Sequence, residues 1–63
     1  MDRTLELLMG QIEERRKQII EALGDGGPKD FAEYRYTVGV VRGLLTAQSL
    51  IADLAKNLEN YDD

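Results

Sequence analysis

Apolar residues recur every three or four positions along two stretches of the chain, a spacing typical of amphipathic helices. In the first stretch, residues 3–23, steps of 100° per residue gather one apolar stripe, made of Leu5, Leu8, Met9, Ile12, Ile19, Ile20 and Leu23. Arg16 projects into this stripe, and we expect its stem to pack while its charged end reaches water or a carboxylate. Asp2 or Thr4 is the predicted N-cap, and Gly24 ends the helix.

The second stretch, residues 31–60, carries two apolar faces instead of one. The first consists of Phe31, Tyr34, Val38, Val41 and Leu45, and the second of Val40, Leu44, Ala47, Ile51, Leu54 and Leu58. A single partner helix covers only the first face, and soluble monomers rarely leave so large an apolar strip in water. The pattern therefore predicts an all-α antiparallel two-helix hairpin that assembles as a homodimeric four-helix bundle or a higher oligomer.

The segment 24–30, rich in glycine, is the predicted turn within a single domain, residues 1–63. Asp30 and Glu33 have the spacing of a capping box, although Pro28 is an alternative first residue of the second helix. Folding the helices back about this turn predicts four pairs: Ile19 with Tyr34, Ile12 with Val41, Leu8 with Leu45 and Leu5 with Gln48. The longer second helix then overhangs the first, which leaves Leu54, Leu58 and Tyr61 without a partner.

Two glycines, Gly39 and Gly43, lie inside the second predicted helix, where each costs about 1 kcal/mol relative to alanine. Their spacing, continued by Ala47, makes a ridge of small residues that allows close approach of another helix. The predicted oligomer interface is Gly39, Val40, Gly43, Leu44, Ala47, Ile51, Leu54 and Leu58. The alternatives are a kink at the glycines, or a short strand over residues 34–41, which are rich in β-branched and aromatic side chains.

Composition narrows the range of partners. The net charge is −4, and acidic and basic residues are interspersed, which argues against a nucleic-acid partner. The longest uncharged run in the second half, residues 43–52, is about half of what a spanning helix requires, so we expect no membrane partner. The first residues lack the basic and apolar regions of a secretory signal, which favours an intracellular protein.

Catalysis is not expected. The chain has no histidine to activate a nucleophile and no cysteine, and two helices offer little volume for a pocket that excludes water. We therefore predict no catalytic residue, no cofactor and no metal site. The remaining candidate contact for an anion or a carboxylate-bearing partner combines Arg16 and Arg35 with Tyr34 and Tyr36, although internal ion pairing and aromatic packing also account for these residues.

The arrangement of Tyr34, Gly39, Gly43 and Leu44, followed by a helix rich in alanine and leucine, resembles a pattern in short helical proteins of tailed bacteriophages. The resemblance covers about half the chain and implies phage origin and a helical hairpin, without an active site. The expected function is that of a non-enzymatic virion structural or assembly component, located in the host cytoplasm or the virion. The alternatives are a regulatory adaptor or inhibitor of a host protein, and an oligomer that binds a small ligand.

Overall fold

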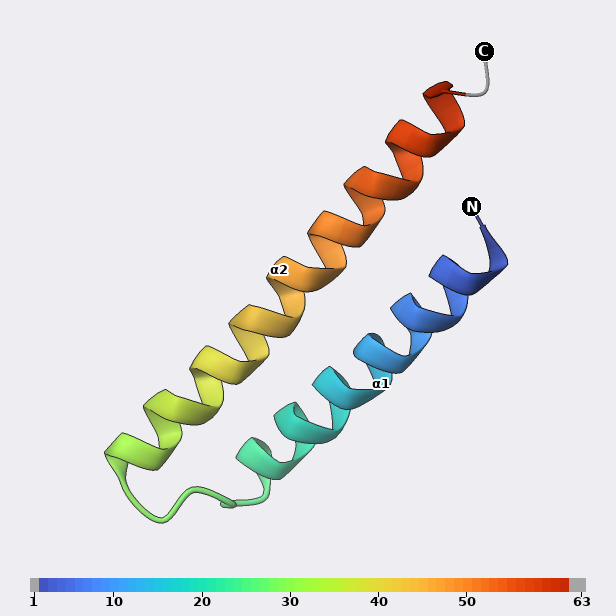
Figure 1. Cartoon of the computed structure of the whole chain (residues 1–63). Helices are drawn as coiled ribbons and strands as arrows, with labels where there is room; N and C mark the ends of the chain where they lie inside the picture. The colour runs from blue at the N-terminus through green and yellow to red at the C-terminus, as the bar shows by residue number, and fades with distance from the viewer. Residues whose placement is uncertain (1, 62–63) are drawn as a thin grey trace.

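The computed structural model describes residues 2–61, with side-chain surroundings for residues 2–59. It contains two helices, α1 (Arg3–Gly24) and α2 (Phe31–Tyr61), which run antiparallel side by side (Figure 1). The resulting rod measures 51 × 17 × 12 Å. The described residues hold no strand, which excludes the alternative of a strand over residues 34–41, and the predicted all-α helical hairpin is confirmed.

Carboxylates cap the N-terminal ends of both helices, where backbone N–H groups lack partners within the helix. The Asp2 side chain accepts a hydrogen bond from the backbone N–H of Thr4 at 2.7 Å, so Asp2 is the N-cap of α1. Ahead of α2, the Asp30 side chain accepts from the backbone N–H of Glu33 at 2.8 Å. The Glu33 carboxylate in turn accepts from the backbone N–H of Lys29 at 3.3 Å. This pair is a variant of the predicted capping box, because Glu33 accepts from the backbone N–H of Lys29 instead of that of Asp30.

Glycine is required at two positions of the turn. Gly26 has φ of +83°, a conformation that other residues rarely adopt. The backbone N–H of Gly27 donates to the carbonyl oxygen of Ala22 at 2.8 Å, and a Cβ atom at Gly27 would lie 3.0 Å from that oxygen. These contacts close the C-terminal end of α1. Helix α2 begins at Phe31, so the alternative start at Pro28 is wrong.

The two helices meet along one stripe each, and both stripes repeat with alternating spacings of four and three residues, as in coiled coils. The α1 stripe is half-buried and consists of Leu5, Met9, Ile12, Arg16, Ile19 and Leu23. The α2 stripe, here called the covered stripe, consists of Thr37, Val41, Leu44, Gln48, Ile51 and Ala55. Ala55, 5% exposed, is the single buried residue among those described. The core of one hairpin is therefore thin.

The prediction that α1 covers the first apolar face of α2 is confirmed only in part. Val38 and Val41 of that face are half-buried, whereas Phe31, Tyr34 and Leu45 remain exposed. Helix α1 lies instead at the junction of the two faces, against Val41 from the first and Leu44 from the second. The physical reason is a polar contact between the helices. The stripe on α1 contains Arg16 and the covered stripe contains Gln48, which helical projection had not counted as an interior position.

The predicted register of the hairpin is also wrong, since Gln48 was paired with Leu5. Gln48 donates a hydrogen bond to Glu13, which lies two helical turns further along α1. Helix α1 therefore lies further towards the C-terminal end of α2, and burial of Ala55 follows from this displacement. The C-terminal end of α2 still extends past the start of α1 (Figure 1). Leu54 and Leu58 lie near this end and are about half exposed, whereas the side chain of Tyr61 falls outside the described residues.

Helix α2 is also long and apolar enough over Phe31–Glu59, by length and composition alone, to cross a membrane. Only 6% of its most apolar 18-residue stretch is buried in the hairpin. The uncharged run that argued against a span is bounded by Arg42 and Asp53, and a spanning stretch that tolerates two charges extends beyond them. The expectation of no membrane partner thus stays a prediction.

Candidate protein-interaction surface

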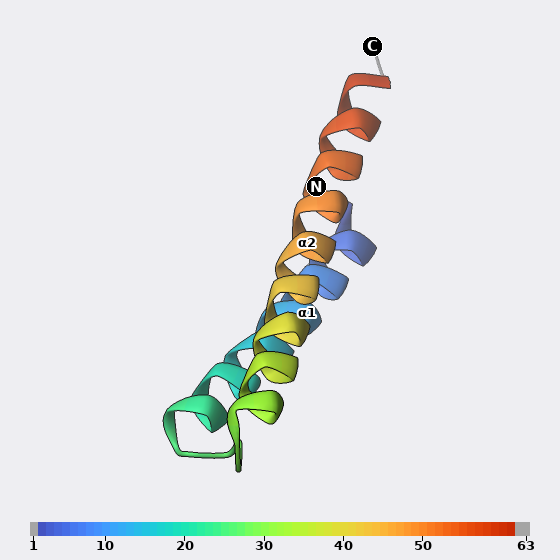
Figure 2. The same cartoon turned by 90° about the vertical axis from the view of Figure 1, so that its left-hand side faces the viewer.

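A second stripe with the same spacing lies on α2, one residue before the covered stripe at every position. It consists of Tyr36, Val40, Gly43, Ala47, Leu50 and Leu54, and is here called the open seam. Tyr36 is 75% exposed, Leu50 64% and Leu54 49%, whereas Val40 and Ala47 are half-buried at the edge of the covered stripe. The two views of the chain show α1 along one side of α2 only (Figures 1 and 2). The open seam therefore has the periodicity of a helix interface, and four of its six members remain exposed: Tyr36, Gly43, Leu50 and Leu54.

The small residues of α2 leave free space on this side of the hairpin. A Cβ atom built on Gly39 or on Gly43 would meet no heavy atom within 4 Å. Neither glycine is needed for contact with α1, and neither has the positive φ that would require glycine. Each weakens α2 by about 1 kcal/mol relative to alanine. A backbone that approaches from outside the hairpin would offset this cost, because it would bring van der Waals contacts that a side chain would block.

The structure divides the residues predicted for the oligomer interface into two groups. Leu44 and Ile51 already face α1 in the covered stripe, and Val40 and Ala47 lie half-buried beside it. The exposed members are Gly39, Gly43, Leu54 and Leu58. Tyr36 and Leu50 were missed as interface residues, although they are the most exposed large side chains of the open seam. The alternation of four- and three-residue spacings is the sequence signal that would have found them.

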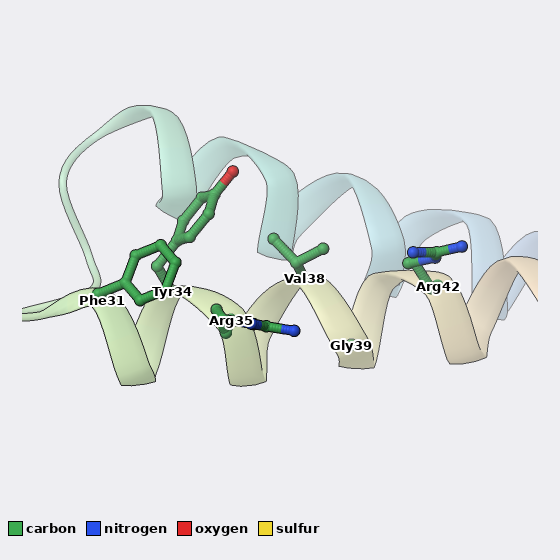
Figure 3. A pocket seen from close by; sticks show the side chains of 6 residues that line it. All are labelled: Phe31, Tyr34, Arg35, Val38, Gly39 and Arg42. Atoms are coloured by element: carbon green, nitrogen blue, oxygen red, sulfur yellow. The ribbon is translucent and has the colours of Figure 1, made fainter.

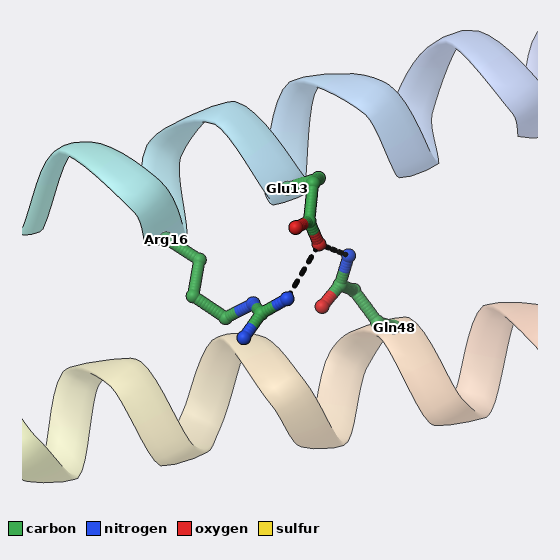
Figure 4. A network of polar contacts seen from close by, with 3 residues as sticks. All are labelled: Glu13, Arg16 and Gln48. Carbon is green, nitrogen blue, oxygen red and sulfur yellow. Dashed lines mark hydrogen bonds and ion pairs between the residues drawn. The ribbon is translucent and has the colours of Figure 1, made fainter. Parts of the chain in front are cut away.

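A polar network joins the two helices in the middle of the hairpin (Figure 4). Arg16 donates to Oε2 of Glu13 at 2.6 Å, and Gln48 donates to the same oxygen at 2.8 Å. The hydrogen bond from Gln48, followed by that from Arg16, lowers the pKa of the Glu13 carboxyl, because both stabilise its charged form. The expected pairing of Arg16 with a carboxylate is therefore present, although its Nε atom is buried without a hydrogen-bond partner.

Such a network selects one alignment of the helices. Arg16 and Gln48 both occupy interior stripe positions, where an unpaired polar group is costly. A shift of α2 by one helical turn would separate Gln48 from Glu13, whereas apolar contacts would re-form at the new register. Polar residues at such positions of coiled coils specify register in the same way. We therefore assign to this network the role of fixing the register between α1 and α2.

The second polar feature is an open pocket at the start of α2, lined by Phe31, Tyr34, Arg35, Val38, Gly39 and Arg42 (Figure 3). The rings of Phe31 and Tyr34 lie 6.2 Å apart, and the Arg35 guanidinium lies 6.0 Å from the centre of the Phe31 ring. Aromatic packing and a cation–π contact therefore account for much of this cluster.

The four residues predicted as an anion or partner contact do not form one site. Arg16 lies between the helices and forms an ion pair with Glu13, and Tyr36 belongs to the open seam. Only Tyr34 and Arg35 share the pocket. No group of three or more potential metal-ligating side chains was found among the described residues. The open seam is thus the surface with the strongest geometric indication of a partner.

Comparison with known protein families, with curated proteins and with solved structures gave no match for this chain.

Proposed function

We propose that this protein is non-enzymatic and acts by protein–protein interaction through α2, most simply as a homodimeric four-helix bundle. One observation carries the proposal: the hairpin, with a single buried residue among those described, leaves four of the six members of the open seam exposed on its longer helix. Burial of apolar surface contributes about 25 cal/mol per Å². A partner on the open seam would therefore supply stability that one thin hairpin core lacks.

The small amount of polar chemistry in the chain supports an interaction role over catalysis. The Arg16 charge is paired with Glu13 inside the hairpin. Arg35 lies over Phe31 in a pocket open to solvent, which gives little exclusion of water. Neither cation therefore lies in the setting expected of a catalytic or tight anion-binding group. This placement also weakens the alternative of a small ligand held by Arg16 and Arg35 between subunits.

The narrower proposal is a virion structural or assembly component of a tailed phage. It rests on the resemblance carried by Tyr34, Gly39, Gly43 and Leu44, together with the elongated shape and exposed seam that suit a repeated subunit. The protein would then be found in the host cytoplasm before assembly and in the virion afterwards. The alternative is an adaptor or inhibitor that uses the same surface on a host protein.

The abundance of the protein in purified particles separates these roles. Particles from an infected culture would be banded by density and the chain quantified by mass spectrometry against a labelled standard. A structural component is expected in many copies per particle, synthesised together with other virion proteins. An adaptor or inhibitor is expected early in infection and absent from the particles, and that result would overturn the virion role while leaving the interaction surface intact.

A further inference from the structure

The exposed area of the hairpin is larger than that of a compact monomer of the same mass. The chain exposes 5108 Å² at a mass of 7.1 kDa. A compact monomer of that mass exposes about 4,100 Å² by the usual scaling. The excess, about 1,000 Å², exceeds the roughly 800 Å² that each partner contributes to a standard protein interface. A second hairpin is therefore a partner of matching size.

The shape of the open seam fits a helix of the same kind. Its centre is narrow at Gly43 and Ala47, and its bulky members, Tyr36 and Leu54, lie at its two ends. Two seams that cross at their centres bring the backbones closest where the side chains are smallest. Pairing about a two-fold axis near Leu45 places Gly43 against Ala47 of the second copy. The same axis places Tyr36 against Leu54 and Val40 against Leu50, so that every member of the seam has a counterpart.

Charges along the margin of the open seam select the direction of the second helix. Arg35 and Arg42 lie along one margin in the first half of α2, and Asp53 lies on that same margin in the second half. All three side chains are exposed. A parallel two-fold pair would place the two copies of this margin on opposite sides of the interface, so that Arg35 and Asp53 of different copies could not approach each other. An antiparallel pair instead brings Asp53 of one copy level with Arg35 of the other.

From these observations we infer that the open seam binds the open seam of a second copy in the antiparallel direction. In the resulting four-helix bundle both α1 helices lie on the same side of the α2 pair, because the covered stripe is about 100° round α2 from the open seam. This inference rests on the proposed self-association, to which it adds the direction and register of the pair. It assigns Tyr36 and Leu50 to the interface and gives Asp53 and Arg35 a shared role in orientation.

Single cysteines test the direction, because the natural chain has none. In the antiparallel pair, a mixture of Tyr36→Cys and Leu54→Cys chains should form a mixed disulfide under mild oxidation. Neither variant should cross-link to itself, since a helix rise of 1.5 Å per residue separates the two copies of residue 36 by about 27 Å. A disulfide requires Cα atoms within about 7 Å. Intact mass spectrometry distinguishes the mixed product from the two homotypic ones.

The controls separate failure of the direction from failure of self-association. Light scattering and circular dichroism on each reduced variant establish that the dimer and the helices are retained. If Tyr36→Cys or Leu54→Cys does not fold, the pair Val40→Cys and Leu50→Cys replaces it. Gly10→Cys, exposed on α1, should yield no cross-link. Efficient homotypic cross-linking of Tyr36→Cys within a dimer would overturn the antiparallel direction and leave self-association in place.

Two further results would overturn both the direction and the homodimer. One is a monomeric mass for the natural chain at every concentration. The other is flotation of the chain with phosphatidylcholine vesicles, which would assign the apolar length of α2 to a bilayer instead of a second copy.

Discussion

The covered stripe and the open seam of α2 share the same spacing and lie one residue apart. Every member of the covered stripe is at least half-buried, whereas only Val40 and Ala47 of the open seam are. The covered stripe is the more polar of the two, because it includes Thr37 and Gln48. The open seam contains only tyrosine, small residues and aliphatic residues. Within one chain, α1 packs against the more polar stripe of α2 and leaves the more apolar stripe largely exposed. The comparison supports the proposal that a second copy covers the open seam.

Leu54→Asp should have the largest effect on this comparison. A carboxylate in the open seam would be buried without a partner in the proposed dimer, at a cost of about 3 kcal/mol or more. We expect the variant to dissociate or unfold, as measured by light scattering and circular dichroism. The matched control is Leu7→Asp, because Leu7 on α1 is 60% exposed and lies outside both α1 and α2 stripes. A Leu54→Asp variant with the mass and stability of the natural chain would contradict burial of the seam.

Gly43→Leu should have an intermediate effect that separates the interface from the hairpin. The glycine Cβ position is open in the single chain, so a leucine fits there and favours the helix by up to about 1 kcal/mol. In the dimer the same side chain would hold the two backbones apart, at a cost of about 1 to 3 kcal/mol. We expect Gly43→Leu to lower the oligomer mass measured by light scattering, although leucine itself favours the helix more than glycine does.

Gly10→Leu is the matched control for that substitution. Gly10 lies in α1, and a Cβ atom there also meets no heavy atom within 4 Å. The control should favour helix formation and leave the oligomer mass unchanged. Equal behaviour of the two variants would remove the role of Gly43 in close helix approach.

The pH dependence of Glu13 should give the smallest effect. Its pKa is lowered in the folded chain by Gln48 and Arg16, so its contribution to stability is present above the ordinary glutamate pKa. That contribution is lost as the pH falls through the lowered value, where the carboxylate becomes protonated. Glu13→Gln should therefore reduce the difference in melting temperature between neutral and acidic pH. Glu14→Gln, a change to an exposed neighbouring carboxylate outside the network, is the control, and an equal reduction in both variants would contradict the assignment.

Helical periodicity and turn chemistry together predict the two helices, the hairpin and the cap at Asp30, and they narrow the first cap to Asp2 or Thr4. They did not predict which part of α2 faces α1, because apolar residues occupy several adjacent stripes and hydrophobicity alone favours none of them. The deciding contacts were polar: Gln48 and Arg16 converge on Glu13, and side-chain reach across two helices does not follow from spacing along either one. For the same reason the predicted interface included Leu44 and Ile51 and omitted Tyr36 and Leu50.

The most direct test of self-association through α2 is the absolute mass of the natural chain in solution. Light scattering over a concentration series, with helicity measured on the same samples, gives both the assembly state and the folded state. We predict a helical dimer of about 14 kDa, twice the mass of 7.1 kDa, that dissociates only on dilution and with loss of helix. A stable helical monomer at every concentration would contradict the account.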